Sequence, residues 1–552
     1  MSTKNRFMGA VRHHDSTWHD GSVAIATPSG KIYALASERV GARYRHYWDS
    51  HLAYEYMRDR MRSRIPFGTK NDSLREGSSH QDRRSQPHHL YHAYSVFWTS
   101  PFDTAAILVA DGQGPQDGFT VATTMWRGTR KSIDLIEVPY RTSGPFIPYS
   151  LGHFYTAISA LTGMTNLYEE GKTMGLAAYG RPSKFLEYLR IYIRSEPDGT
   201  FFLDPAFIYA VFGNTFGPRY YGWSPQSPEI QKIWDEILEM RSTPMRTSDA
   251  PVSQDDMDIA YAGQTLLEEV VLGLARRLKQ QTGERNLCLA GGVALNCSVN
   301  GKLLALGLFD NVYVIPSVDD SGQALGRLFY DLHSEGVSIA TEVGSPYLGP
   351  SYSKKEIQLA ISSTEDLHVK HQGFPVVAQA AAKLIAEGKV IGWFQGRSEI
   401  GPRALGNRSI LADPRNPGMR GYINQNVKHR EWYRPVAPAV LEEDASLYFR
   451  LDRPLPFMLF AVQAKAEKIK EIPSVVHVDG SARVQTVNEH QNSRFYRLIR
   501  EFKLITGVPV LINTSFNARR EPIVESPTDG LLAFKRMNLD ALVLGDFLIL
   551  RK

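Results

Sequence analysis

The chain has 552 residues, of which 43% are hydrophobic and 22% are charged, and its net charge is +5. These values are typical of a globular protein, and at roughly 100–200 residues per domain the length predicts three or four domain-sized units. No apolar run reaches the ~18–20 residues that cross a bilayer, and residues 1–12 hold no apolar signal segment. We therefore expect a soluble, cytoplasmic protein with no membrane partner.

The two cysteines, Cys288 and Cys297, are too few for a disulfide framework or a cysteine-ligated zinc site, and the apolar runs around them predict that both are buried. A metal would therefore need His and carboxylate ligands. The small net charge argues against nucleic acid as a partner. Arg and Lys are in local excess between residues 58 and 84, but the Gly-, Ser- and Asn-rich composition of residues 68–86 favours a loop.

Alternating apolar segments and helical spacing predict the element order. Strands are expected at residues 7–11, 22–26, 32–36, 105–110, 120–126, 133–138, 287–290, 312–315, 390–394 and 510–512. Helices are expected at residues 150–161, 258–281 and 376–387. The first three strands predict a β-meander, and the next three repeat that pattern, as an internal duplication would. A Gly- and Pro-rich stretch at residues 343–350 places the main boundary between domains 1–345 and 346–552.

The clearest metal signal is a pair of histidines, His88 and His92, which are four positions apart and so share one helix face. Two carboxylates strengthen it, because Asp111 and Asp320 each follow a predicted strand. The alternative is a polar helix face without a metal, with His89 as an exposed neighbour.

Glycines at the ends of predicted strands allow a phosphate chain to approach the backbone. Gly291 and Gly292 stand between a strand and a helix, whose N-terminal amides could bind a nucleotide. With Gly112 and the Glu170-Gly171-Lys172 segment, this design resembles the two-lobed ATPases of the actin, sugar-kinase and Hsp70 type.

Two further groups carry possible chemistry. His14 beside Asp15 is a candidate general base, with a capped turn as the equal alternative. In the C-terminal half, cations among glycines suit bidentate recognition of phosphate or carbamate. A strand then ends in the polar row Asn513, Ser515 and Asn517, which could bind a small planar group or merely cap a turn.

The motifs together resemble those of the NodU/CmcH-type carbamoyltransferases over nearly the whole chain. Those that carry the resemblance are His14-Asp15-Ser16, Glu38-Arg39, His88-His89-Leu90-Tyr91-His92-Ala93, Asp111-Gly112, residues 170–177, 291–296, 401–409, 428–431, 478–483 and 513–517. The sequence departs from the family pattern at two places, which bear on the binding of the carbamoyl acceptor. Ser481 stands where Thr is usual, and Arg39 is followed by Arg43-Tyr44-Arg45-His46 rather than a closely spaced Arg-x-Lys-His.

The resemblance implies an α/β protein whose N-terminal domain has the two-lobed actin/sugar-kinase/Hsp70-like ATPase fold, as in threonylcarbamoyladenosine synthase, and whose C-terminal domain is YrdC-like. It also implies the site residues. In the first domain these are His14 and Asp15 for catalysis, His88, His92, Asp111 and Asp320 for the metal, and Gly112, Gln113, Glu170, Lys172, Gly291, Gly292 and Asn296 for the nucleotide or carbamoyl adenylate. In the second domain Arg403, Arg408, Lys428, Arg430, Arg483, Asn513, Ser515 and Asn517 would bind carbamoyl phosphate and ATP.

The implied activity is ATP-dependent O-carbamoylation of a small natural product, such as an antibiotic or toxin, through carbamoyl adenylate. The expected cofactor is a divalent metal, for which the resemblance suggests Fe²⁺. The expected co-substrates are ATP with Mg²⁺ and carbamoyl phosphate. The expected partner is a small-molecule hydroxyl acceptor, with a homodimer left open. The alternatives are a threonylcarbamoyladenosine-type tRNA-modifying enzyme and a nucleotide-dependent small-molecule kinase.

Overall fold

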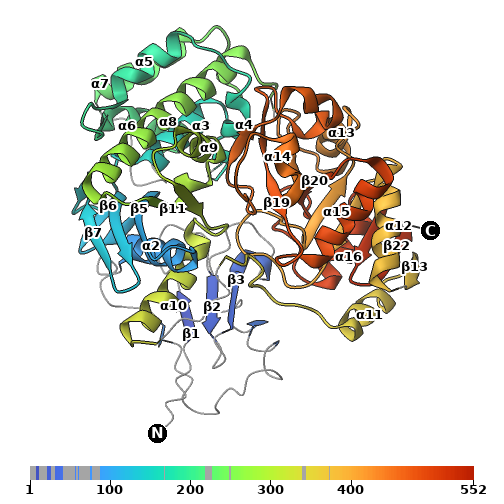
Figure 1. Ribbon diagram of the computed structural model, residues 1–552. Coiled ribbons are helices and arrows are strands. Elements are labelled where there is room, and N and C mark those ends of the chain that lie inside the picture. Colours follow the sequence, from blue (N-terminus) through green and yellow to red (C-terminus); the bar gives the residue numbers. More distant parts are fainter. Residues whose placement is uncertain are drawn as a thin grey trace. The chain divides into compact units, whose positions relative to one another are not determined.

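The computed structural model describes residues 8–11, 22–26, 31–40, 56–57, 60, 75–76, 87–166, 168–217, 227–247, 250–337, 344–371 and 373–551. The chain forms two compact units, which Figure 1 colours along the sequence. One unit combines Met1–Ser79 with Ile315–Lys552, and the other is His80–Val314. The predicted boundary at residue 345 separates a domain for carbamoyl transfer from one for adenylate formation, and this division stays a prediction.

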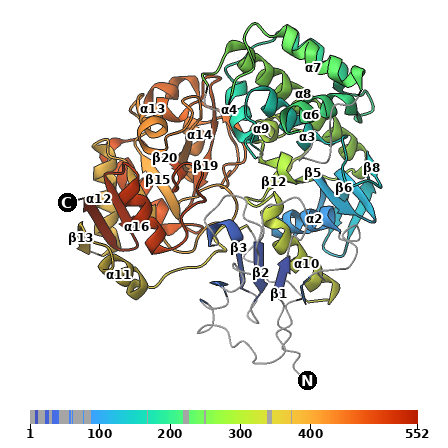
Figure 2. The same ribbon diagram turned by 180° about the vertical axis from the view of Figure 1, so that it is seen from behind.

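The predicted β-meander opens the first unit. Strands β1 (Met8–Val11), β2 (Ser22–Ala26) and β3 (Ile32–Ala36) pair antiparallel in that order, as the sequence predicts. The short strand β4 (Arg75–Glu76) adds to the other edge of β1 in parallel. Helix α10 (Gln323–Ser334) packs against β1 and β2, so residues far apart in sequence complete this layer (Figure 2).

The second unit is built on a six-stranded sheet of order β12-β11-β5-β6-β7, with β8 beside β6. Strands β5, β11 and β12 are parallel, whereas β5, β6 and β7 form an antiparallel meander. This mixed sheet, in a unit that also contains helices, confirms the α/β class expected from the sequence. The bounds are β5 (Thr104–Gln116), β6 (Phe119–Thr129), β7 (Ile133–Glu137), β8 (Arg141–Thr142), β11 (Asn286–Ala290) and β12 (Asn311–Val314).

Helices cover both faces of this sheet (Figure 1), with α2 (His88–Thr99) on one face and α3 (Leu151–Leu161) and α8 (Gln254–Thr282) on the other. The long helix α8 starts at a capping box between Ser253 and Asp256 and ends at Gly283, whose φ is +65°. The remaining elements are α4 (Glu170–Ala177), α5 (Lys184–Tyr192), β9 (Ile193–Ser195), β10 (Phe201–Leu203), α6 (Pro205–Thr215), α7 (Pro228–Met240), η3 (Gly292–Leu295) and α9 (Cys297–Leu306).

The C-terminal part of the first unit contains an eight-stranded mixed sheet of order β13-β22-β21-β14-β15-β20-β16-β19. Its strands are β13 (Leu367–His371), β14 (Ile391–Phe394), β15 (Arg408–Ala412), β16 (Ala437–Leu441), β19 (Gln485–Val487), β20 (Val510–Ser515), β21 (Ala541–Leu544) and β22 (Phe547–Arg551). A separate pair joins β17 (Ala461–Gln463) to β18 (Ser481–Arg483).

Helices α12 (Phe374–Ala386) and α15 (Ser493–Thr506) pack on each other and on this sheet, while α16 (Pro527–Arg536) packs on β14 and β21. The shorter helices of the unit are η1 (Ser37–Arg39), η4 (Asp320–Gly322), α11 (Lys354–Ser362), α13 (Met419–Tyr422), η5 (Ile423–Val427), η6 (Glu442–Asp444), α14 (Ala445–Tyr448), η7 (Ala466–Glu471) and η8 (Pro473–Val475).

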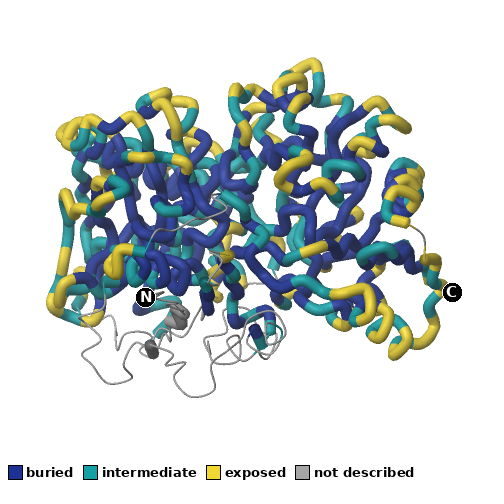
Figure 3. Tube along the Cα trace, turned by 60° about the horizontal axis from the view of Figure 1, so that its bottom comes forward, coloured by how far each residue is buried: buried dark blue, intermediate teal, exposed yellow. Residues whose placement is uncertain are grey.

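Burial along the trace (Figure 3) is concentrated in the sheets and the inner helix faces, and the exposed segments are mainly outer helices and turns. Both cysteines, Cys288 and Cys297, are buried, as expected from their apolar surroundings. Among the residues that the structure describes, none of the helices combines the length and the apolar character that crossing a membrane would require.

Candidate functional site

The predicted histidine pair lies on one face of α2, as its spacing requires. The Nε2 atoms of His88 and His92 lie 3.2 Å and 3.4 Å from Oδ2 of Asp111, and both imidazoles are buried. His89 is not the exposed neighbour that a metal-free helix face would have. It is fully buried, and its Nδ1 shares a 2.9 Å hydrogen bond with Thr124 Oγ1.

Asp111 lies in an irregularity of β5 rather than at the end of that strand. The predicted strand 105–110 continues to Gln116, and its register with β6 shifts between Ala110 and Gly114. Such a bulge turns a side chain away from its regular direction. The Gly292 amide donates a 2.8 Å hydrogen bond to Asp111 Oδ1, which leaves Oδ2 directed toward the imidazoles.

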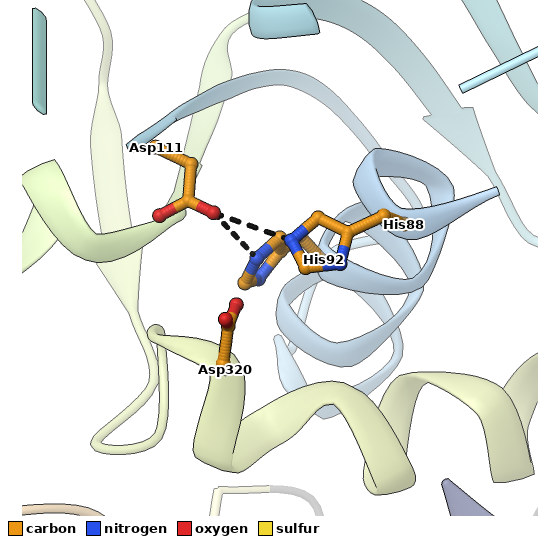
Figure 4. Close-up of side chains that lie close together, drawn as sticks. All are labelled: His88, His92, Asp111 and Asp320. Carbon is orange, nitrogen blue, oxygen red and sulfur yellow. Dashed lines mark hydrogen bonds and ion pairs between the residues drawn. The ribbon is translucent and has the colours of Figure 1, made fainter. Parts of the chain in front are cut away.

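Asp320, the first residue of η4, completes the predicted set. One ligand atom each from His88, His92, Asp111 and Asp320 lies within 4.8 Å of the others (Figure 4). Imidazole nitrogens and carboxylate oxygens that converge in this way are ligand types that suit a divalent transition metal. The Gly292–Asp111 hydrogen bond is the kind of outer contact that orients a metal ligand.

Two of the predicted nucleotide glycines differ in what surrounds them. Gly291 has φ +85°, and a Cβ there would lie 2.3 Å from the Ala110 carbonyl oxygen, so glycine is required by the backbone itself. Gly112 is different, since the nearest atom to an added Cβ is His153 Nε2 at 3.9 Å. Space beside Gly112 is therefore available, as close approach of a phosphate chain would need.

The other predicted nucleotide residues are held by their neighbours. The Gln113 amide bonds to Pro145 O and Ile147 N, and Asn296 pairs with Gln264 while it caps α9. Glu170 accepts a 2.6 Å hydrogen bond from Thr156 Oγ1, and Lys172 pairs with Glu169. Contact of these side chains with a nucleotide stays a prediction.

His153 is a residue that the sequence reasoning missed. Its Nδ1 lies 3.0 Å from the Ile147 carbonyl oxygen, and its ring stacks on Phe146 at a centroid distance of 4.9 Å. Burial lowers the pKa of His153 to about 4, so the ring is neutral near pH 7. Nδ1 must then be protonated to donate to the carbonyl, which leaves Nε2 as an acceptor toward Gly112. A lone histidine in an apolar helix gives no sequence signal for this position.

The C-terminal half brings three of its predicted residues together around the Lys428 ammonium. It donates to Ser515 O at 2.7 Å, and to Asn517 O and Oδ1 at 3.0 Å and 2.7 Å. Ser515 Oγ donates a 2.6 Å hydrogen bond to the same Asn517 Oδ1. Lys428 is only 4% exposed, so these oxygens hold a buried positive charge at the end of β20.

Arg430 lies next to this cluster in the chain, and its Nε donates to Asn424 Oδ1 at 2.8 Å. Asn513, the first residue of the polar row, is buried, and its Nδ2 donates to Gln485 Oε1 at 2.8 Å. Arg403 follows Gly401 in a tight loop, and Arg483 ends β18. Their contact with substrate stays a prediction.

Arg408 occupies a different environment from the other predicted cations. Its side chain is fully buried and donates to the carbonyl oxygens of Gln395, Asn407 and Glu525. Burial lowers the pKa of Arg408 and raises that of Glu525, whose carboxylate lies 3.7 Å away. Contact of Arg408 with substrate, like that of Lys428, stays a prediction. The predicted catalytic residues His14 and Asp15 lie outside the described residues.

Comparison with known proteins identifies the family. Residues 44–328 match the model of the carbamoyltransferase N-terminus, and residues 382–551 match that of the carbamoyltransferase C-terminus. Nodulation protein NolO of Bradyrhizobium diazoefficiens is 37% identical over 478 residues, which cover 84% of this chain and 79% of that protein. Nodulation protein U of the same organism is 38% identical over 257 residues, covering 47% of this chain and 43% of that protein.

Solved structures give weaker matches. Full-length HypF in its phosphate- and nucleotide-bound form matches with a TM-score of 0.31 and 14% identity, over 61% of this chain and 47% of that chain. The 2-hydroxyisocaproyl-CoA dehydratase activator of Clostridium difficile with bound ADPNP matches with a TM-score of 0.32 and 13% identity, over 60% and 97%. The N-terminal family model alone covers more than half of the sequence, so the chain belongs to the carbamoyltransferase family and is a carbamoyltransferase.

Proposed function

We propose that the enzyme is an ATP-dependent O-carbamoyltransferase that forms carbamoyl adenylate and transfers its carbamoyl group to a hydroxyl of a small natural product. Membership of the carbamoyltransferase family identifies the transferred group as carbamoyl. The observation that carries the ATP-dependent step is the buried Lys428 ammonium between Ser515 and Asn517, since a buried cation at a strand end suits an anionic substrate.

The first step belongs to the C-terminal half. Water splits carbamoyl phosphate into carbamate and phosphate, a carbamate oxygen attacks the α-phosphorus of ATP, and pyrophosphate leaves. Both substrates are anions, so cations must offset their mutual repulsion as they meet. A carbamate or phosphate oxygen would replace one of the Ser515 or Asn517 oxygens at the Lys428 ammonium. Arg403, Arg430 and Arg483 would bind the remaining anionic groups.

The second step belongs to the N-terminal half. The acceptor hydroxyl attacks the carbamoyl carbon, AMP leaves, and His14 takes the hydroxyl proton as general base with Asp15 beside it. His88, His92, Asp111 and Asp320 would hold a divalent metal, for which their donor atoms suit Fe(II), Mn(II) or Zn(II) and the family resemblance favours iron. When bound, this ion would act as a Lewis acid toward the carbamoyl oxygen. Gly112 would let the adenylate phosphate lie against the backbone.

The test uses the full chain loaded with Fe²⁺ and supplied with ATP, Mg²⁺, carbamoyl phosphate and a panel of hydroxyl compounds. Mass spectrometry should find one added carbamoyl group on a compound, and pyrophosphate release should require carbamoyl phosphate. Transfer of a phosphoryl group to a compound without pyrophosphate release would instead establish a kinase. Threonine-dependent modification of added tRNA would establish the tRNA-modifying alternative.

A further inference from the structure

One buried amide organises the loop that carries two of the proposed substrate-binding cations. Asn424 has no exposed surface and lies in η5, the π-helical turn that precedes Lys428. The Lys428 amide closes that turn by donating to the Ile423 carbonyl oxygen at 2.8 Å. Such turns are frequent at functional sites.

The Asn424 side chain bonds to every second residue of the loop that follows. Its Oδ1 accepts from Arg430 Nε at 2.8 Å, and its Nδ2 donates to the carbonyl oxygens of Trp432 at 3.2 Å and Arg434 at 2.9 Å. The backbone adds a fourth contact, because the Arg430 amide donates to Asn424 O at 2.9 Å. A guanidinium can only donate and a carbonyl can only accept, so one amide orientation satisfies all three side-chain partners.

The loop needs this support because its backbone is strained between the two cations. His429 has φ +47°, a left-handed conformation that residues other than glycine rarely adopt. That conformation turns the chain so that Lys428 points to Ser515 and Asn517 while Arg430 returns to Asn424. Without the Asn424 side chain, the Arg430 guanidinium and the carbonyl oxygens that follow the His429 turn lose this common partner.

We infer that Asn424 is a positioning residue for the adenylate-forming site, which acts by fixing the Arg430 guanidinium and the His429 turn before substrate binds. This assignment rests on the proposed function. Groups that orient a binding residue typically change affinity or activity by about 10- to 100-fold when they are removed. No motif of the sequence singles out this asparagine.

The test measures carbamoyl phosphate-dependent pyrophosphate release by the full-length enzyme, with KM for each substrate determined separately. Whichever KM is raised by Arg430→Ala should also be raised by Asn424→Ala, by about 10- to 100-fold. The double variant Asn424→Ala/Arg430→Ala should have a KM less than about threefold above that of Arg430→Ala alone. The effects of two substitutions on KM do not add when one residue acts through the other. A purely structural role would not produce this pattern.

Asn492→Ala is the matched control. Asn492 is also buried in the C-terminal part and makes three hydrogen bonds, to Tyr347, Asn407 and Phe495, so its loss should lower stability with both KM values unchanged. If Asn424→Ala is insoluble, Asn424→Asp keeps the size and the acceptor for Arg430 but sets a carboxylate against two carbonyl oxygens, and it should raise the same KM.

A wild-type KM in either soluble Asn424 variant, or full additivity in the double variant, would overturn the assignment of Asn424. The proposed function would still stand in that case, provided that the wild-type enzyme releases pyrophosphate with carbamoyl phosphate. A wild-type enzyme that releases no pyrophosphate with carbamoyl phosphate would overturn the proposed function and this assignment together.

Discussion

Arg39 donates a 2.9 Å hydrogen bond to the carbonyl oxygen of Gly401, although 362 positions of sequence separate the two residues. Gly401 has φ +79°, and an added Cβ would lie 2.3 Å from the Pro316 carbonyl oxygen, so its loop is tightly packed on both sides. The same Arg39 guanidinium lies 3.7 Å from the buried carboxylate of Glu525. One arginine after the first sheet thus supports the loop that leads to Arg403.

Replacing Arg39 by methionine should therefore destabilise the protein. The Arg39 and Glu525 side chains are only 2% and 1% exposed, and removing one partner of a buried ion pair typically costs about 3–5 kcal/mol. Because Arg408 also lies 3.7 Å from Glu525, we expect a loss near the lower end of this range. Chemical denaturation of Arg39→Met measures the loss. The control is Arg536→Met, which removes an exposed pair with Glu521 and should cost less than about 1 kcal/mol. Equal losses in both variants would contradict the role of burial.

His153 should make the stability depend on pH. Its folded-state pKa is about 4, below the ordinary value of 6.5. Between these two pKa values the unfolded chain is protonated at His153 and the folded protein is not. The contribution of the neutral ring to the free energy of unfolding is therefore complete above pH 6.5 and is lost as the pH falls toward 4. At 1.36 kcal/mol per pKa unit the difference reaches about 3 kcal/mol.

The measurement compares unfolding free energies of the wild type and His153→Met between pH 7 and pH 4. Methionine fills a similar volume and does not titrate, so subtraction removes the contributions of all other groups. The wild type should lose more stability than the variant over this range. Parallel pH profiles would show that His153 titrates normally.

The parts of the site that depend on local periodicity could be predicted from the sequence. The spacing of His88 and His92 fixes them on one helix face wherever that helix packs, and the structure confirms this. The glycines Gly112 and Gly114 predict a loop after Asp111 and therefore a strand end at that residue. The strand continues instead, because pairing with β6 resumes beyond the irregularity and local composition does not encode that partner.

Contacts across long sequence distances could not be predicted at all. The Arg39–Gly401 bond and the engagement of Arg408 with Glu525 leave no spacing pattern, so Arg408 looked like the other cations of its motif. Asn424 was missed for a related reason. Its partners lie within ten positions, but a single asparagine before a cationic segment carries no period or repeat that distinguishes it from a surface residue.

Gly114→Ala should weaken metal binding although it replaces none of the proposed ligands. A Cβ at Gly114 would lie 2.1 Å from Cδ2 of the His88 ring, so the imidazole must move away from Asp111. We expect metal affinity to fall by about 10- to 100-fold, as when an outer partner of a ligand is lost. Metal analysis after dialysis against a graded chelator measures this. Gly144→Ala is the control, since its Cβ would meet only Thr142 Oγ1 at 3.5 Å. Wild-type metal retention by Gly114→Ala would argue against His88 as a ligand.

The two proposed steps should separate by mutation, because their catalytic groups lie in different halves of the sequence. Lys428→Ala removes a buried ammonium and should abolish carbamoyl phosphate-dependent pyrophosphate release, since a lost charge-assisted contact costs roughly 2–4 kcal/mol. The exposed Lys470→Ala should leave it unchanged. His14→Asn should keep pyrophosphate release while slowing carbamoyl transfer by roughly 10²–10⁴-fold, the usual contribution of a general base. If His14→Asn stopped pyrophosphate release as fully as Lys428→Ala, His14 would act in the first step, and the assignment of one reaction to each half would be wrong.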